Sequence, residues 1–506
     1  METSTLITFI VYLIFLLIIG VVMYRRTSDL SDYVLGGRKL GPGVAALSAG
    51  ASDMSGWLLL GLPGAIYASG LSEAWMAIGL STGAYLNWQF VAKRLRVYTE
   101  VSNNSITIPD FLANRFKDKS HLLRVISALV ILLFFLFYTS SGMVAGAKLF
   151  EASFGLPYHA ALLIGALVVV SYTLFGGFLA VAWTDFIQGI LMFLALIVVP
   201  IVALNQMGGW NEAVQAVGEI NPDHLNMIQG VGVIAILSSL AWGLGYFGQP
   251  HIIVRFMALK SPKDVKKARF IGTTWMVLGL YGSIFVGFIG LAFISTQDVS
   301  VLSQLGIEIT TEDGLQVLGD PEKIFIAFSQ ILFNPVVAGV LIAGILSSIM
   351  STVDSQLLVS SSAVAEDFYK AIFRRNASDK ELVWVGRLAT LLIALFAVLI
   401  AINPDSSVLD LVSYAWAGFG AAFGPIILLA LFWKRATRTG AVAGILTGAL
   451  TVIVWGDLLE GGLFDLYEIF PGFILNLVVT IVVSLFTTPD PEIEREYNQT
   501  LEKLND

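Results

Sequence analysis

Apolar runs of about twenty residues, separated by short polar breaks, follow one another along the chain. They cover approximately residues 6–24, 42–68, 72–91, 124–147, 159–180, 186–206, 231–256, 272–295, 329–362, 384–402, 409–433, 440–458 and 470–487. A helix of that length crosses the hydrocarbon core of a bilayer. The pattern predicts an all-α polytopic membrane protein with about thirteen transmembrane helices in a lipid bilayer.

The first run, 6–24, differs from a leader sequence. It is preceded by METST, which carries no positive charge, and it is followed by Arg25 and Arg26. A cleaved signal peptide has the opposite polarity and a shorter apolar centre. We therefore interpret the run as a retained first helix.

The positive charges alternate from loop to loop. With thirteen spans, all but two of the 29 Lys and Arg residues fall in loops on the side of the C-terminus, the exceptions being Lys148 and Lys323. Cytoplasmic loops carry an excess of Lys and Arg. The sequence thus predicts that the N-terminus is outside and that the C-terminus is in the cytoplasm.

The domain organisation follows from the same pattern. Residues 1–487 are expected to form a single transmembrane domain, and residues 488–506 a short, charged cytoplasmic tail. The longest outside loop, 296–328, is acidic and is either a solvated cap or an extracellular gate.

Composition narrows the function. The chain is 56% hydrophobic and 13% charged, whereas soluble proteins carry about 25% charged residues. It has no cysteine, which excludes disulfides and thiolate metal sites, and its four His residues are scattered. No P-loop supports ATP-driven transport. We expect no enzymatic activity, no nucleic-acid partner and no obligatory protein partner.

Two apolar runs contain helix-weakening residues. SAGASDMSG, 48–56, carries Asp53, and AWGLGYFGQPHI, 241–252, carries three glycines and Pro250. Paired interruptions of this kind point to the binding site of a secondary transporter. The runs are the second and the seventh. Runs 2–6 and 7–11 are therefore predicted to form five-helix inverted repeats, with runs 1, 12 and 13 peripheral.

A third polar segment is SSIMSTVDSQ, 347–356. Ser348, Thr352 and Ser355 share a helix face, and Ser351 lies one position away. These hydroxyls could simply form hydrogen bonds to neighbouring helices or to carbonyls of their own helix. Beside carbonyls freed at a broken helix, they would also suit Na⁺, which is a hard cation.

Charged and aromatic side chains inside apolar runs are further candidates. Asp53 lies within the predicted break, and intramembrane carboxylates are usually functional. Asp185 is either functional or a helix cap, and Asp354 follows the hydroxyl cluster. Trp242 and Tyr246, spaced i, i+4 beside the second break, either pack or line a substrate site.

Several segments carry a family resemblance. LSAGASDMSGWLLLGLPGA, RLRVYTE, LFGGFLAVAWTD, AWGLGYFGQPHIIVRFMA, ELVWVGR and LVSYAWAGFGAAFGP closely resemble the bacterial sodium/proline symporters of the sodium:solute symporter family. The resemblance extends from the first run to about residue 480. It implies thirteen helices with a five-plus-five inverted-repeat core of the LeuT type, in agreement with the helix count.

The resemblance also implies roles for individual residues. Sodium would be bound by the carbonyls of Ala51, Met54 and Ser348 and the hydroxyls of Ser351 and Thr352. Asp53 matches the carboxylate essential for sodium coupling, with Ser55 and Gly56 beside it. Proline would contact Trp57, Tyr138, Trp242, Tyr246 and Pro250. Asp185 matches a position that some relatives use for a second sodium ion, and Asp354 departs from the family pattern.

The implied function is secondary active transport in the bacterial cell membrane, with inward Na⁺ movement driving uptake of L-proline by alternating access. Another small solute, such as a betaine, pantothenate or a sugar, is a variant of the same prediction. A channel or a membrane sensor is the alternative class. The chain has no filter-like repeat and no attached signalling domain.

Overall fold

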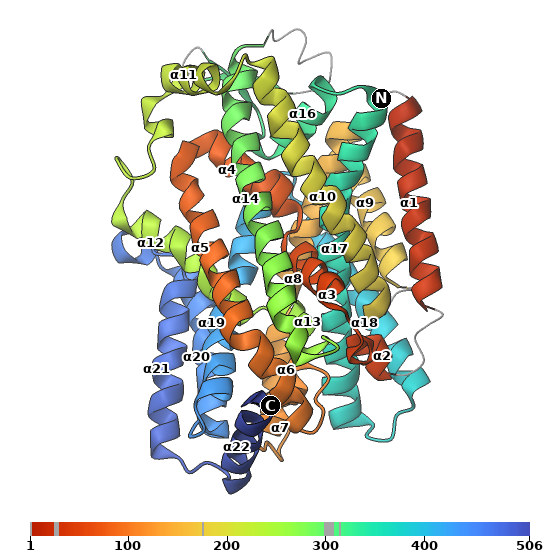
Figure 1. Cartoon of the computed structure of the whole chain (residues 1–506), viewed down its shortest axis with the longest axis vertical. Helices are drawn as coiled ribbons and strands as arrows, with labels where there is room; N and C mark the ends of the chain where they lie inside the picture. Colours follow the sequence, from red (N-terminus) through yellow and green to blue (C-terminus); the bar gives the residue numbers. More distant parts are fainter. Residues whose placement is uncertain (1–2, 25–29, 175–176, 298–307, 313–314, 506) are drawn as a thin grey trace.

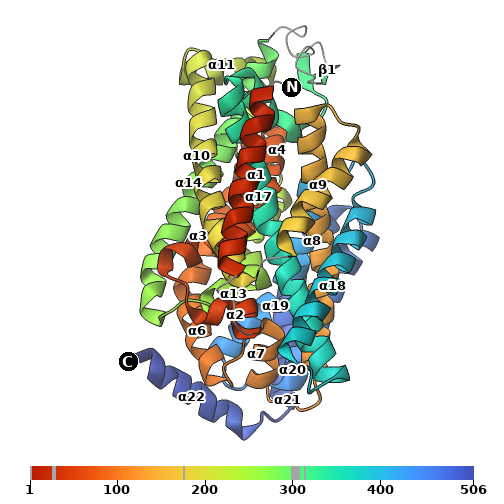
Figure 2. The same cartoon turned by 90° about the vertical axis from the view of Figure 1, so that its right-hand side faces the viewer.

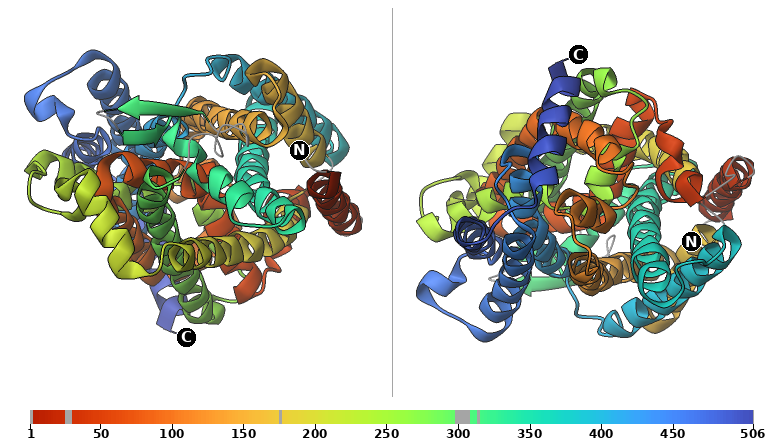
Figure 3. Two further views of the ribbon diagram at one scale, coloured as in Figure 1. Left: turned by 90° about the horizontal axis from the view of Figure 1, so that it is seen from above. Right: turned by 90° about the horizontal axis from the view of Figure 1, so that it is seen from below.

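The computed structural model describes residues 3–24, 30–174, 177–297, 308–312 and 315–505. They form an elongated bundle whose helices run mostly along its long dimension (Figure 1). The first helix, α1 (Thr3–Tyr24), begins near one end of the bundle, and the last helix, α22 (Pro491–Asn505), lies across the other end (Figure 2). Views along the long axis place α1 at the rim of the bundle (Figure 3).

The first half of the chain is helical. Its elements are α1, α2 (Leu30–Leu35), η1 (Gly36–Arg38), α3 (Pro42–Asp53), η2 (Trp57–Gly61), α4 (Leu62–Ser69), η3 (Gly70–Glu73), α5 (Ala74–Leu86), η4 (Asn87–Val91), α6 (Ala92–Val101), α7 (Ile108–Arg115), α8 (Leu122–Phe154), α9 (Tyr158–Thr173), α10 (Phe178–Gln206), α11 (Trp210–Ile220) and η5 (Pro222–Leu225).

In the second half, the described residues add an antiparallel pair of short strands to further helices. Its elements are α12 (Val233–Ala241), η6 (Trp242–Phe247), α13 (Pro250–Met257), η7 (Pro262–Asp264), α14 (Val265–Ser295), β1 (Ile309–Glu312), β2 (Leu315–Leu318), η8 (Pro321–Lys323), α16 (Ile324–Ile331), α17 (Pro335–Ser362), η9 (Ala363–Phe373), α18 (Asp379–Ile400), α19 (Val408–Phe432), α20 (Arg438–Leu458), η10 (Gly462–Asp465), α21 (Ile469–Phe486) and α22.

The helices are those of a polytopic membrane protein. Eight helices of the described residues are long and apolar enough to cross a bilayer, and the bent pair Pro42–Asp53 and Trp57–Val101 makes a ninth. The apolar segments Ser4–Ile19, Tyr158–Ser171 and Val233–Phe247 are shorter. The predicted membrane class is therefore confirmed, whereas the count of thirteen stays a prediction.

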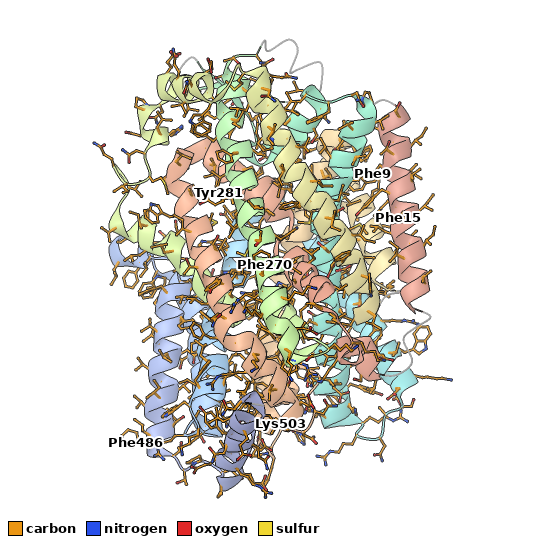
Figure 4. The ribbon with its side chains drawn as sticks, viewed as in Figure 1. Phe9, Phe15, Phe270, Tyr281, Phe486 and Lys503 are labelled. Atoms are coloured by element: carbon orange, nitrogen blue, oxygen red, sulfur yellow. The ribbon has the colours of Figure 1, made fainter. Side chains whose placement is uncertain are left out.

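Large apolar side chains cover the outside of the bundle. Phe270 and Phe486 are 72% and 86% exposed, and Tyr281 and Phe15 also point outward (Figure 4). Water disfavours so much apolar surface, whereas lipid tails accept it. The inward-facing Phe9 is only 3% exposed and packs on Phe150 and Phe154.

The broken segments lie at the centre of the bundle. α3 packs against α10, α13, α14 and α17, and the helical turn η6 packs against α5 and α19. Glycine permits the close approach of η6 to α5, because a Cβ atom on Gly83 would lie 2.1 Å from the carbonyl oxygen of Gly243. The second break is thus packed directly against the backbone of α5.

Several element boundaries differ from the sequence prediction. The run 329–362 contains a helix start, since Asn334 caps α17 and Pro335 occupies its first turn. The run 72–91 continues through η4 and α6 to Val101. The tail 488–506 contains α22, whose Ile493 is fully buried. Arg25 and Arg26 lie outside the described residues.

Candidate functional site

The break in the second apolar run lies where the sequence predicts it. α3 ends at Asp53, and Met54 leaves the helical conformation with φ −81° and ψ 73°. The Ser55 N–H turns back to the Asp53 carbonyl at 2.9 Å instead of continuing the helical pattern. The Ala51 carbonyl is thereby released for donors from other helices. The chain changes direction by 61° at this point.

The released carbonyl meets the hydroxyl face of α17. Ala51 O accepts hydrogen bonds from Ser351 Oγ at 2.8 Å and from Thr352 Oγ1 at 3.3 Å. The Ser348 carbonyl lies 3.3 Å and 3.2 Å from the same two hydroxyls, so each hydroxyl shares its single hydrogen between two carbonyls. All four residues are buried. The structure thus brings together carbonyl and hydroxyl oxygens from two helices, and Met54 is buried at the adjoining break.

The α17 hydroxyls also make the ordinary helix contacts that the sequence left open. Ser348 Oγ donates to the Ile345 carbonyl at 2.7 Å, and Ser355 Oγ donates to the Ser351 carbonyl at 2.8 Å. These bonds satisfy hydroxyls inside an apolar bundle. The α17 hydroxyls considered are those of Ser348, Ser351, Thr352 and Ser355. Of these, only Ser351 and Thr352 donate to the broken helix α3.

Asp53 lies at the centre of the predicted substrate residues. Its carbonyl accepts from Trp57 Nε1 at 3.1 Å and from the Tyr138 hydroxyl at 3.3 Å. Its carboxylate oxygen Oδ2 accepts from the Tyr246 hydroxyl at 2.5 Å. Asp53 is 2% exposed. Three aromatic residues from α8 and both broken segments therefore converge on one residue.

Further ring contacts extend this aromatic group. The rings of Trp57 and Trp242 lie 6.4 Å apart, and Trp416 of α19 stacks on Trp242 at 6.3 Å. Trp416 also contacts Tyr246 edge-on at 5.0 Å and donates through Nε1 to the Trp242 carbonyl at 2.8 Å. Trp416 was missed in the sequence analysis, although it lies in the family segment LVSYAWAGFGAAFGP.

Three other predicted residues have different surroundings. The Ser55 hydroxyl accepts from the Trp57 N–H at 3.3 Å. Gly56 lets α8 approach, because a Cβ there would lie 2.7 Å from Ala145 Cβ. Pro250 begins α13 and lines a separate cavity with Leu358 and Asp367, so the structure does not place it in the Asp53 hydrogen-bond group.

Asp185 is buried in a charged network. Its Oδ2 accepts from Ser48 Oγ at 2.7 Å and from Arg255 Nη2 at 3.2 Å. The same guanidinium donates to Ser355 Oγ at 2.5 Å, and Ser355 Oγ lies 3.4 Å from Asp354 Oδ1. Arg255 was missed in the sequence analysis, although a charge within the apolar HIIVRFMA is itself a signal.

The alternative that Asp185 caps a helix is wrong. α10 begins at Phe178 and its N-cap position is Gly177, so Asp185 lies inside the helix, beyond its first two turns. The predicted boundary between the fifth and sixth runs was too late in the sequence. Asp185 therefore acts between helices, through Ser48 and Arg255.

The described part of the acidic loop is tied to three helices. Glu322 forms an ion pair of 2.6 Å with Lys148 of α8, and its carboxylate accepts from the N–H groups of Val408 and Leu409 at 3.1 Å. It thereby caps α19 in the favourable direction of the helix dipole. The Leu318 N–H donates to the hydroxyl of Tyr67 of α4 at 3.1 Å.

Two ionisable groups outside the spans are affected by burial. Burial lowers the pKa of Arg38 to about 10, although its guanidinium donates to carbonyls of Met257 and Ser105 at 2.7 Å and 2.8 Å. Burial raises the pKa of Glu468, at the N-terminus of α21, to about 7. Arg38 therefore stays charged at neutral pH, whereas Glu468 titrates there.

Comparison with known proteins gives consistent matches. The model of the sodium:solute symporter family matches residues 33–448. The high-affinity proline transporter PutP of Bacillus subtilis is 53% identical over 96% of this chain and 98% of its own length. The osmoregulated proline transporter OpuE of the same organism is 51% identical over 100% of this chain and 99% of its own length. The Escherichia coli sodium/proline symporter is 52% identical over 96% of this chain and 93% of its own length.

Solved structures share the fold at low sequence identity. A substrate-bound, outward-open Na⁺-coupled sialic acid symporter has a TM-score of 0.78 and 18% identity, over 96% of this chain and 99% of its own. The nucleobase-cation-symport transporter Mhp1, in a closed conformation, has a TM-score of 0.56 and 15% identity, over 93% of this chain and 98% of its own.

Proposed function

The chain belongs to the sodium:solute symporter family, and on this premise we propose that it couples inward movement of Na⁺ to uptake of L-proline by alternating access. The observation that carries this function is the identity of about half of all residues, over nearly the full length, with transporters named for sodium and proline. The chain is a transporter rather than an enzyme, and Na⁺ is its co-transported ion. It is a multi-pass protein of the bacterial plasma membrane.

The full topology comprises thirteen spans. They are α1, α3–α4, α5–α6, α8, α9, α10, α12–α13, α14, α17, α18, α19, α20 and α21. The N-terminus is outside and the C-terminus cytoplasmic, which agrees with the Lys and Arg distribution.

α3–α10 and α12–α19 form the inverted repeats. Residues 1–487 constitute one transport domain, and 488–506 form the cytoplasmic tail. The matching breaks after Asp53 and around Trp242 support this pairing.

Na⁺ binds between α3 and α17. Its ligands are the carbonyls of Ala51, Met54 and Ser348 and the hydroxyls of Ser351 and Thr352. The contacts from both hydroxyls to Ala51 O support this set, because lone pairs of hydroxyl and carbonyl oxygens suit a hard cation. Ser348 contributes a carbonyl, so an Ala at this position in relatives would serve equally.

Proline binds beside the Asp53 segment. The aromatic rings of Trp57, Tyr138, Trp242 and Tyr246 form an apolar wall suited to the pyrrolidine ring. Ends of broken helices and hydroxyls are suited to its carboxylate and ammonium groups.

Pro250 contributes indirectly, by starting α13 directly after the second break. Ser55 and Gly56 shape the break itself, through the Ser55–Trp57 contact and the close approach of α8.

Coupling follows from the position of both sites on one broken segment. Ala51 faces α17, and Asp53, two residues later, bonds to Tyr246 of the second break. Sodium that fixes Ala51 against α17 also fixes the backbone of Asp53 and the aromatic groups bonded to it. Na⁺ thereby favours the conformation that binds proline, to the extent of its differential affinity for the two states.

Asp185 stabilises the bundle through its ion pair with Arg255, and Asp354 lies next to the same guanidinium by way of Ser355. A second sodium ion at Asp185, as in some relatives, would have to compete with the guanidinium for the same carboxylate. We assign Asp354 no ligand role.

Uptake into proteoliposomes tests the function. The purified chain, under an inward Na⁺ gradient, should accumulate labelled L-proline above its external concentration and release it when the gradient collapses. A channel would only equilibrate proline, and a sensor would not move it. A competition panel of amino acids and betaines, with and without Na⁺, identifies the solute. Accumulation of another solute in preference to proline would overturn the substrate assignment.

A further inference from the structure

The last helix, α22, is docked on the end of the bundle rather than free of it (Figure 2). One of its faces is turned inward: Ile493 and Thr500 are 0% and 3% exposed, and Tyr497 between them is partly buried. The spacing of these residues is that of one side of an amphipathic helix. Glu494 and Glu502 lie on the exposed side. The helix therefore has a defined seat on the bundle.

Contacts with α6 and the segments next to it anchor α22 near both of its ends. The helix packs against α6. Glu496 forms an ion pair with Lys117, directly after α7, and accepts from Ser102 Oγ at 3.4 Å. At the other end, Lys93 Nζ of α6 donates to the Leu504 carbonyl at 2.8 Å. The side chains of Lys117 and Glu496 are only 16% and 19% exposed, so water screens this pair less than a surface pair. All these partners lie in the first of the two proposed repeats.

Two further contacts tie α22 to the end of α19, in the second repeat. The Tyr497 hydroxyl donates to the Phe432 carbonyl at 3.0 Å, and Lys434 forms a 2.6 Å ion pair with Glu494. The side chains of this pair are 53% and 59% exposed. An exposed ion pair and one hydrogen bond are weaker than the buried anchor on α6. α22 thus bridges the repeats and holds the second one less firmly.

The end of α19 is a junction between the repeats. The last carbonyls of a helix have no partner within it. Here the carbonyl of Ala430 accepts from Arg115 of α7 at 2.9 Å, and that of Leu431 accepts from Arg94 of α6 at 3.1 Å. The next carbonyl is the one bonded to Tyr497 of α22. Three consecutive carbonyls are therefore capped from three elements outside the second repeat.

We propose that α22 is a latch on the cytoplasmic side of the transporter: it stays on α6 and releases the end of α19 when that side opens. The inference rests on the proposed topology and on alternating access, in which one repeat or bundle moves against the other. The bonds from Tyr497 and Glu494 break in this movement. The latch restrains inward opening, and salt on the cytoplasmic side weakens it by screening the exposed pair.

Reversible cross-linking of the full chain tests the latch. The chain has no cysteine, so an engineered pair provides its only thiols. Joining Lys434→Cys to Glu494→Cys with a bifunctional methanethiosulfonate should lower Na⁺-driven proline uptake at least about tenfold, because the bridge spans a moving junction. Reduction should restore uptake. The matched pair Lys117→Cys/Glu496→Cys joins α22 only to the first repeat and should transport with its cross-link in place.

The double variant Tyr497→Phe/Lys434→Gln removes both bonds to α19 without a reagent. It should raise the maximal uptake rate about two- to tenfold, the range expected from one hydrogen bond and one exposed ion pair. The apparent affinities for Na⁺ and proline should stay unchanged, because α22 lies at the end of the bundle, away from α3 (Figure 2). KCl on both sides of the membrane should accelerate the wild type but not this variant. Glu502→Gln, on the exposed side of α22, is the control and should behave like the wild type.

Three results would overturn the latch: full uptake by the cross-linked Lys434→Cys/Glu494→Cys chain, equal losses in both cross-linked pairs, or an unchanged uptake rate in the double variant. Each would show that α22 is a fixed part of the bundle. Na⁺-driven proline uptake by the wild type in the same vesicles separates such a result from a failure of the proposed function.

Discussion

The hydroxyl of Tyr246 donates a 2.5 Å hydrogen bond to the carboxylate of Asp53, and this contact joins the two broken segments of the bundle. Tyr246 lies in η6, directly before α13, and Asp53 is the last residue of α3. Both side chains are buried. This hydrogen bond therefore links the two breaks directly, in addition to the ring contact between Trp57 and Trp242.

Asp53→Asn should raise the Na⁺ concentration for half-maximal proline uptake by at least about tenfold. The substitution keeps the size of the side chain and removes a negative charge from the break that carries the proposed sodium ligand Ala51, so the attraction between this charge and the cation is lost. Uptake into proteoliposomes over a range of Na⁺ concentrations measures the effect. Asp405→Asn, in an exposed loop, is the control. Unchanged sodium dependence in Asp53→Asn would remove the carboxylate from coupling.

Tyr246→Phe should weaken proline binding about ten- to hundred-fold. A hydrogen bond to a charged group contributes about 1.5–3 kcal/mol, and the phenylalanine ring keeps the contact with Trp416. Tyr246→Ala should weaken binding further, because the ring is lost as well. Binding of labelled proline at saturating Na⁺ provides the measurement. An unaltered affinity in both variants would reject the aromatic wall as the proline site.

Ser351→Ala should raise the Na⁺ requirement while leaving proline affinity at saturating Na⁺ close to that of the wild type. The variant removes one hydroxyl that bonds to Ala51 O and leaves Thr352 in place. Ser361→Ala is the control, because its hydroxyl lies further along α17 and bonds only to its own helix at Leu358 O. Equal sodium curves for the two variants would place the ion elsewhere.

The family and the membrane class could be predicted from the sequence, and the comparisons confirm both. The first break was predictable because Gly and Ser weaken a helix locally, and α17 carries its hydroxyls at helical spacing. Arg255 and Trp416 were not predicted, because their roles depend on packing between distant segments. Arg255 meets a residue 70 positions away, and Trp416 meets one 174 positions away. No local pattern encodes such contacts.

Some helix boundaries also could not be predicted from the sequence alone. Asn334 and Pro335 are a recognisable helix start, yet hydropathy alone merges α16 with α17. The docking of α22 depends on contacts that the tail sequence does not reveal. Glu496 forms an ion pair with Lys117, and Tyr497 donates to the Phe432 carbonyl at 3.0 Å. A charged tail could be recognised from composition, but its docking surface could not.

Arg255→Met should destabilise the protein by about 3–5 kcal/mol. Arg255 forms a fully buried 3.2 Å ion pair with Asp185, and removing one partner leaves an uncompensated charge in the bundle. The double variant Asp185→Leu/Arg255→Met should recover part of that loss, because neither charge then remains unpaired. Thermal unfolding in detergent measures both. A double variant as unstable as the sum of the single variants would show that the two groups are not coupled.

Glu468→Gln should raise the unfolding temperature at pH 8 by a few degrees and have little effect near pH 4.5. Burial raises the pKa of Glu468 from 4.5 to about 7, so the folded protein keeps the proton at pH values where the unfolded chain has lost it. Stability therefore falls as pH rises from about 4.5 to about 7, by on the order of 3 kcal/mol, and stays low above that range. Glutamine removes the ionisation and with it this dependence. Glu460→Gln, at an exposed position nearby, should unfold like the wild type at both pH values. An equal gain for Glu468→Gln at both pH values would assign the effect to packing rather than to charge.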